Sequence, residues 1–83
     1  MSGERPTRER MLELEARGEA AYAAMYDARP HEEKDLKDDA LLYLAEARRI
    51  AEALDLVADV ERLKARADNI MGVYNSQFRP VGR

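Results

Sequence analysis

The stretch LKDDALLYLAEARRIAEAL, residues 36–54, decides the fold of this 83-residue chain. Its apolar residues recur at intervals of three and four, which is the period of one face of an α-helix. This stripe consists of Leu36, Ala40, Tyr43, Ala47, Ile50 and Leu54. Leu41, Leu44 and Ala51 stand beside it and widen the apolar face. A wide face is expected of the middle helix of three, because that helix packs against one partner on each flank.

The segments on either side carry narrower apolar stripes of the same period. The first stripe consists of Met11, Leu14, Gly18, Ala21, Met25 and Ala28. The second consists of Leu56, Val57, Val60, Leu63, Ala67, Ile70, Tyr74 and Phe78. Thr7 is a typical N-cap residue, and Pro30 ends the first pattern. We therefore predict three helices, at about 7–28, 32–54 and 56–78.

Short connections between these helices predict an all-α, up-down-up antiparallel three-helix bundle. The bundle would form one domain, residues 7–78, between a flexible N-terminus, residues 1–6, and a flexible C-terminal tail, residues 79–83. Asp55 is expected to serve as the hinge or cap before the third helix. Gly18 lies on the first stripe, where a missing side chain permits two helices to approach closely.

An up-down-up order makes the third helix parallel to the first and separates two kinds of side chain. The aromatic residues should gather in the half that contains the first connection: Tyr22, Tyr26, Tyr43, Tyr74 and Phe78. The opposite half is aliphatic. We expect Ile50 and Leu63 to be buried there, so that replacing either with alanine costs about 2–5 kcal/mol of stability.

Composition narrows the function classes. The chain has no cysteine and one histidine, which excludes a disulfide framework and a thiolate zinc site. Its apolar stretches are too short to span a bilayer, so we expect a soluble, cytoplasmic protein without membrane contact. The net charge is −3, with both signs mixed along the chain. This balance argues against electrostatic binding of nucleic acid, including single strands on the arginines near Tyr74 and Phe78.

No catalytic or cofactor motif stands out. The four glycines are scattered, so no phosphate-binding loop is present, and Ser76 has no base at motif spacing. His31 with Asp27 and Asp35 could bind a divalent metal or move a proton. Pro30 breaks the helix between Asp27 and His31, which favours an exposed turn instead. We therefore predict no enzyme activity, no cofactor, no metal and no small-molecule substrate.

Acidic residues cluster at the start of the second helix: Glu32, Glu33, Asp35, Asp38 and Asp39. Negative charge is favourable there because it complements the helix dipole, and it keeps the surface hydrated. The alternative is that this cluster attracts a basic partner.

Residues 40–74 resemble the junction between consecutive tetratricopeptide repeats. AEARRIAEALD corresponds to the alanine-rich end of one repeat, and NIMGVY, residues 69–74, corresponds to the start of the next. The resemblance implies that Gly72 lets two helices approach and that Tyr74 fills the gap beside it. One residue separates these two where the repeat has two, so the resemblance implies a repeat-like helical hairpin plus one helix. The whole chain also resembles small bacterial proteins of unassigned function, which implies no activity.

The run NIMGVYNSQF, residues 69–78, is the longest uncharged stretch of a chain in which 37% of residues are charged. Interface centres are typically depleted of charge and enriched in aromatic residues. The run and the tyrosines opposite it therefore give a candidate partner-binding set: Tyr22, Tyr26, Asn69, Val73, Gln77 and Phe78. The alternative is that residues 75–77 merely form the fraying last turn of a helix.

The sequence thus favours a small, non-enzymatic protein–protein interaction module whose partner is an unidentified protein. Two other functions stay open. The chain could be a structural homo-oligomer, in which the aromatic end or Leu41 and Leu42 pack against a second copy. It could also be an acidic inhibitor that masks a basic site on another protein.

Overall fold

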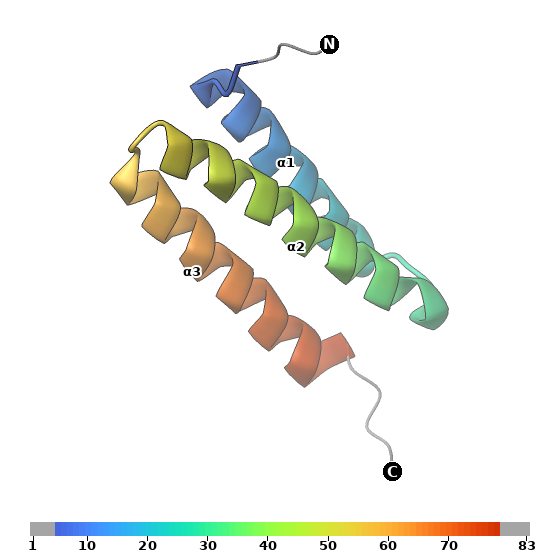
Figure 1. Cartoon of the computed structure of the whole chain (residues 1–83). Helices are drawn as coiled ribbons and strands as arrows, with labels where there is room; N and C mark the ends of the chain where they lie inside the picture. Colours follow the sequence, from blue (N-terminus) through green and yellow to red (C-terminus); the bar gives the residue numbers. More distant parts are fainter. Residues whose placement is uncertain (1–4, 79–83) are drawn as a thin grey trace.

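A computed structural model of the chain describes residues 5–78. Three helices lie side by side in an up-down-up antiparallel bundle (Figure 1), which confirms the predicted fold class. The predicted flexible tail at 79–83, and most of the predicted flexible N-terminus at 1–6, lie outside the described residues.

The helices end close to the predicted positions. They are α1 (Arg8–Met25), α2 (Pro30–Ala53) and α3 (Val57–Val73), and α3 continues into a π-helical turn, η1 (Tyr74–Phe78). Helix α1 begins where the sequence predicts, because the Thr7 hydroxyl accepts a hydrogen bond of 3.0 Å from the Arg10 backbone N–H.

The connection between α1 and α2 corrects two predicted boundaries. Helix α1 ends at Met25 rather than at residue 28, because the next backbone N–H groups bond to carbonyls three residues back. Arg29 is extended, as expected before proline. Pro30 is the first residue of α2, two residues before the predicted start, because proline lacks only an N–H that a first turn leaves unpaired. The Glu32 carboxylate accepts a hydrogen bond of 3.3 Å from the Arg29 N–H and completes this start.

The connection between α2 and α3 is a Schellman turn. The Leu56 N–H bonds to the Ala51 carbonyl at 2.9 Å, and the Asp55 N–H bonds to the Glu52 carbonyl at 3.1 Å. Asp55 has a φ angle of 59°, which is the left-handed conformation that this turn requires. The predicted hinge at Asp55 is therefore confirmed.

The carboxyl-terminal end of α3 departs from the prediction of an α-helix to residue 78. After Val73 the chain widens into the π turn η1. The Ser76 hydroxyl donates to the Val73 carbonyl at 3.3 Å and competes with the α-helical hydrogen bonds of this turn. Because a π turn contains more residues than an α turn, Phe78 comes to a different side of the axis than the α-helical stripe predicts.

The core lies between the apolar faces of all three helices. Its buried residues are Met11, Leu14, Met25, Ala40, Leu44, Ala47, Ala51, Leu63 and Ile70. Leu63 is buried as predicted, whereas Ile50 is only partly buried at the edge of the core. Val57 is 70% exposed, so its place on the predicted stripe of α3 is wrong. Leu56, the preceding residue, packs against the core instead.

Helices α1 and α2 approach each other closely at Gly18. Gly18 of α1 is buried on α2, and a Cβ atom at this position would lie 3.1 Å from both the Ala40 carbonyl oxygen and Leu44 Cγ. The predicted packing role of Gly18 is confirmed. Gly72 is exposed, and a Cβ there would meet nothing within 4 Å. Close helix approach is thus a property of Gly18 rather than of Gly72.

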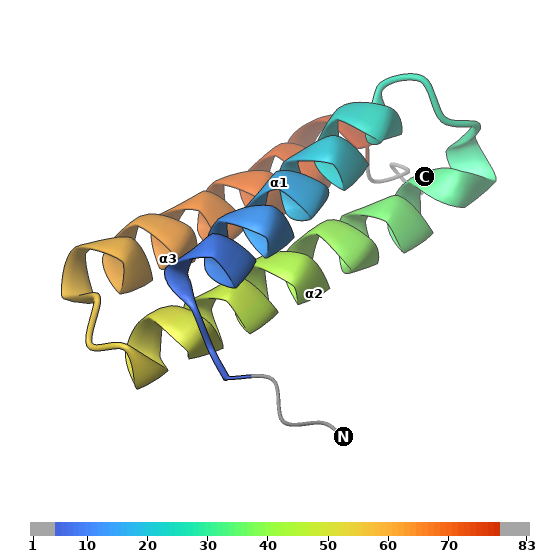
Figure 2. The same cartoon turned by 90° about the horizontal axis from the view of Figure 1, so that it is seen from above.

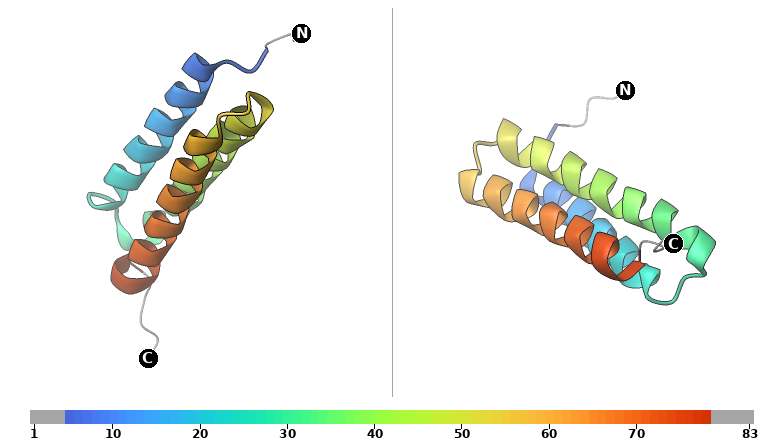
Figure 3. Two further views of the ribbon diagram at one scale, coloured as in Figure 1. Left: turned by 90° about the vertical axis from the view of Figure 1, so that its left-hand side faces the viewer. Right: turned by 90° about the horizontal axis from the view of Figure 1, so that it is seen from below.

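Helices α1 and α3 both pack against α2 but hardly approach each other backbone to backbone. Figures 2 and 3 show the arrangement of the three helices from other sides. Long side chains bridge α1 and α3 instead. Glu15 pairs with Arg62, Glu19 pairs with Arg66, and the ring of Tyr26 contacts that of Phe78. We call these three contacts the α1–α3 seam.

Candidate protein-binding surface

Three aromatic rings meet at the end of the α1–α3 seam that contains the first connection. The rings of Tyr22 and Tyr26 are edge to face, with centroids 5.6 Å apart, and their hydroxyl groups lie 3.0 Å apart. Phe78 extends the row, because its ring is edge to face with Tyr26 at 4.9 Å. Tyr26 is nevertheless 55% exposed. The row is therefore both ordered by its own contacts and open to solvent.

Arg66 fixes the inner end of this row. Its guanidinium lies over the Tyr22 ring, 4.9 Å from the ring centroid. Two nitrogens of the same group contact the two oxygens of the Glu19 carboxylate, each at 2.7 Å. We call Tyr22, Tyr26, Phe78 and Arg66 together the tyrosine surface.

The ion pair between Glu19 and Arg66 shifts the pKa of both residues. The hydrogen bond from Arg66 lowers the pKa of Glu19, although partial burial opposes the shift. The hydrogen bond to Glu19 raises the pKa of Arg66. The hydrogen bond with Tyr26 raises the pKa of Tyr22. Near neutral pH the surface thus presents the Arg66 cation beside the neutral phenol of Tyr22.

The structure brings four of the six candidate residues into one connected set. The Tyr26 ring contacts those of Tyr22 and Phe78, and Asn69 joins them because its side-chain oxygen accepts a hydrogen bond of 2.8 Å from Arg66. Val73 follows Asn69 by one turn on the same flank of α3 but is partly buried.

Gln77 is exposed in η1 beside Phe78. No hydrogen bond or ring contact joins its side chain to the tyrosines among residues 5–78. Gln77 stays in the candidate partner-binding set only because it is next to Phe78 in the sequence.

Sequence reasoning missed Glu19 and Arg66, which hold the surface together. A signal for them was present. Glu15 and Glu19 are one turn apart on α1, and Arg62 and Arg66 are one turn apart on α3. Because α1 and α3 are parallel and both pairs have the same spacing, two ion pairs are expected between them. This expectation also requires knowing how far α3 is shifted along the bundle axis relative to α1.

Lys37 and Tyr74 form a second aromatic contact on the side of η1 that faces α2. The Lys37 ammonium lies 4.9 Å from the Tyr74 ring centroid and 2.7 Å from an Asp38 oxygen. Lys34 also contacts Asp38, at 2.9 Å. Hydrogen bonds from these two lysines lower the pKa of Asp38. Part of the acidic start of α2 is thus neutralised within the chain, which weakens the case for it as a docking site for a basic partner.

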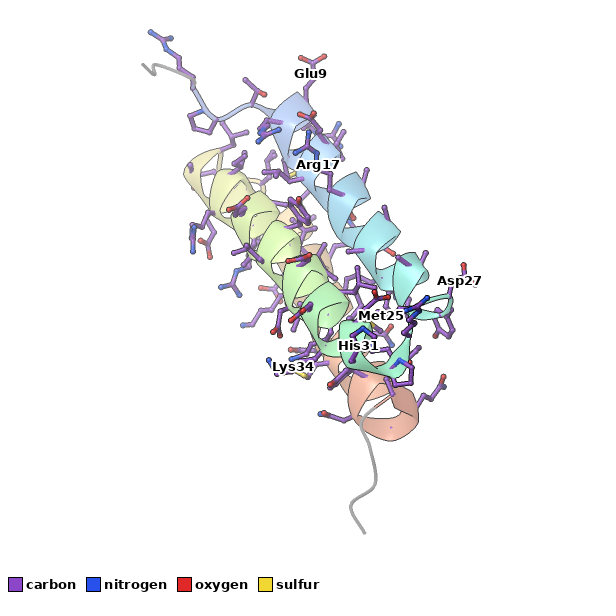
Figure 4. The ribbon with its side chains drawn as sticks, turned by 90° about the vertical axis from the view of Figure 1, so that its right-hand side faces the viewer. Glu9, Arg17, Met25, Asp27, His31 and Lys34 are labelled. Carbon is purple, nitrogen blue, oxygen red and sulfur yellow. The ribbon has the colours of Figure 1, made fainter. Side chains whose placement is uncertain are left out.

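His31 lies in the first turn of α2 and not in the connection, because Pro30 already begins the helix. Asp27 projects away from the connection, apart from His31 (Figure 4). No group of three or more acidic, histidine or cysteine side chains is placed to hold a metal ion within residues 5–78. None of the helices in this part of the chain has the length and apolar character needed to cross a membrane.

The chain matches no model of a known protein family, no curated protein and no solved structure. Its class is therefore defined by its own geometry, an all-α three-helix bundle. The resemblance of residues 40–74 to tetratricopeptide repeats stays a prediction.

Proposed function

We propose that this chain is a small, non-enzymatic, cytoplasmic protein-binding module whose partner docks on the tyrosine surface. The observation that supports this proposal most is that Tyr26 is 55% exposed although its ring packs between Tyr22 and Phe78. Tyrosine and arginine are the side chains enriched at the energetic centres of interfaces. In the tyrosine surface the Arg66 guanidinium lies over the ring of Tyr22.

Pre-organisation supports the same proposal. Ordering a free side chain on binding costs about 0.5–1.5 kcal/mol. The rings are already held by edge contacts, and Arg66 is already held by both oxygens of Glu19. A partner that docks here would lose little entropy for the contact area it gains. The uncharged residues 69–78 then form the neighbouring part of the contact area.

Photocrosslinking tests the proposal. A benzophenone amino acid placed at position 26 should capture a protein in native cells, and the same group at position 12 should not. Leu12 is a matched control because it is also exposed, at 40%, on the half of α1 away from the tyrosines. The captured protein is then purified and its affinity is measured by calorimetry.

The affinity measurement decides the outcome. Replacing Tyr26 with serine should weaken binding at least about tenfold, as expected for an interface hot spot, while Leu12→Ser should not change it. The affinity should fall little with added salt, because ring burial is not screened. Equal binding by wild type and Tyr26→Ser, or affinity that collapses with salt as an acidic inhibitor's would, contradicts the proposal.

A further inference from the structure

Helices α2 and α3 carry apolar side chains that the described part of the chain leaves exposed. Leu42 is 53% exposed, Val57 is 70% exposed and Met71 is 38% exposed. Between the two helices the surface is hollowed by a cavity of about 250 Å³. Its lining includes Leu41, Ala45, Arg48, Lys64, Ala67 and Asp68. We call this hollow the α2–α3 groove.

Helix α3 carries a second, mostly apolar stripe, of which Lys64 and Ala67 line this groove. It consists of Val57, Val60, Lys64, Ala67 and Met71, at intervals of three, four, three and four. Its period is that of a coiled-coil seam, in which a single lysine sets the register of the partner helix. Two of these residues, Val60 and Ala67, also pack against the core, in which Leu63 and Ile70 of α3 are fully buried. The stripe therefore widens the apolar face of α3 beyond the core, and the described chain leaves Val57 and Met71 at its two ends exposed.

The charges of the groove are separated along its length. Because α2 and α3 are antiparallel and joined at Asp55, Asp68 lies at the end of the groove that carries Leu41. Arg48 lies toward the opposite end. Among residues 5–78 it pairs with Glu52, at 3.9 Å, and its Nε is covered there without a hydrogen bond. The cationic end of the groove is therefore incompletely paired.

We propose that the α2–α3 groove is a dimer interface that takes a second copy of this chain in antiparallel orientation. The twofold axis would pass over Ala45 and Ala67, whose small side chains allow the closest approach. A twofold rotation there reverses the direction of the groove. Asp68 of one copy then meets Arg48 and Lys64 of the other copy, and the reciprocal contact forms at the other end.

This charge pattern is what selects a second copy as the occupant. A peptide with charges of one sign would satisfy one end of the groove and be repelled at the other. The twofold arrangement satisfies both ends with the same residues, and it covers Leu42 and Met71. The groove lies on a different side of the bundle from the tyrosine surface, so the dimer does not depend on the function proposed above.

Sedimentation equilibrium of the full chain tests this dimer. The wild type should show a monomer–dimer equilibrium. Asp68→Arg should raise the dimer dissociation constant at least about 100-fold, because two like-charge contacts replace two attractive ones, each worth about a factor of ten. Arg48→Asp should do the same. The double variant Arg48→Asp/Asp68→Arg restores the opposite charges and should return the constant to within about tenfold of wild type.

Two controls keep the test specific. Far-ultraviolet circular dichroism must show the same helix content in each variant, since Arg48 and Asp68 are surface residues. Tyr26→Ser, on the tyrosine surface, should leave the dimer constant unchanged. A monomer at every concentration up to about 1 mM, no rescue by the double variant, or a dimer weakened by Tyr26→Ser but not by Asp68→Arg would each overturn the proposal.

Discussion

Glu19 and Arg66 form a two-pronged ion pair across the α1–α3 seam, with both nitrogen–oxygen distances at 2.7 Å. Both side chains keep about a third of their surface exposed, at 38% and 33%, so solvent screens the pair. Replacing Glu19 with glutamine should therefore lower the stability at pH 7 by about 0.5–1 kcal/mol, which is the upper range for exposed pairs. Thermal melts monitored by circular dichroism measure this difference.

The pH dependence of that difference gives a sharper check. Arg66 lowers the pKa of Glu19 in the folded chain from its ordinary value of 4.5. The stabilisation is therefore fully present above pH 4.5 and is lost as the pH falls through the lowered pKa. The melting temperatures of wild type and Glu19→Gln should converge below that value. A constant gap from neutral to strongly acidic pH would show that the charge of Glu19 is not involved.

The two described glycines provide a matched pair of substitutions. Gly72→Ala should stabilise the chain by about 0.5–1 kcal/mol, because alanine favours helices and its Cβ meets nothing within 4 Å. Gly18→Ala carries the same propensity gain but places a Cβ 3.1 Å from the Ala40 carbonyl and from the buried Leu44. Overpacking costs about 1–3 kcal/mol, so this variant should be destabilised. Chemical denaturation compares the two, and an equal gain at both positions would contradict the tight α1–α2 contact.

Asp55 adopts the left-handed backbone conformation that the Schellman turn between α2 and α3 requires. A side chain at a φ of 59° is less favourable than glycine there. Asp55→Gly should therefore stabilise the chain by about 0.5–1 kcal/mol, although the more flexible unfolded chain offsets part of the gain. Asp55→Ala is the control, and it should give no gain because alanine also has a Cβ. Urea unfolding measures both variants, and a gain with alanine equal to that with glycine would rule out this explanation.

Replacing Leu63 with alanine should lower the free energy of unfolding more than replacing Ile50 with alanine. Leu63 is 1% exposed within the core, so Leu63→Ala should cost about 2–5 kcal/mol and leave a chain of this size close to unfolding. Ile50 is only partly buried, and Ile50→Ala should cost less than about 2 kcal/mol. Equal losses at the two positions would mean that Ile50 is more deeply packed than the structure shows. Urea unfolding of both variants supplies the comparison.

The three-helix fold could be predicted from the sequence because apolar residues repeat with the helical period in three segments. Periodicity identifies a face but does not choose between neighbours such as Leu56 and Val57. That choice depends on the Schellman turn, which sets the rotation of α3 as it begins. The turn in turn depends on Asp55 adopting a left-handed conformation, which the sequence allows without requiring it.

The candidate surface was predicted less completely than the fold. Tyr22, Tyr26 and Phe78 could be placed at one end from helix direction alone. Phe78 contacts Tyr26 from the π turn η1, and nothing in the pattern of residues 74–78 distinguishes this turn from an α turn. Arg66 was missed because it is 47 residues from Glu19 in the chain, and their pairing depends on the relative height of α1 and α3. The relative height of α1 and α3 is set by how each helix packs against α2, and local helix propensity does not determine it.

The division of contacts between the helices also determines the order of events as the chain folds. Helix α2 packs with α1 and with α3, and both are its neighbours in the chain, so loop closures are short and folding should be fast. The α1–α3 seam joins distant residues through side chains alone and can form last. Glu19→Gln should therefore accelerate unfolding and leave the folding rate nearly unchanged in stopped-flow experiments. The ion pairs of Arg62 and Arg66 would then form after the three helices have packed, and they would slow the unfolding of the assembled bundle.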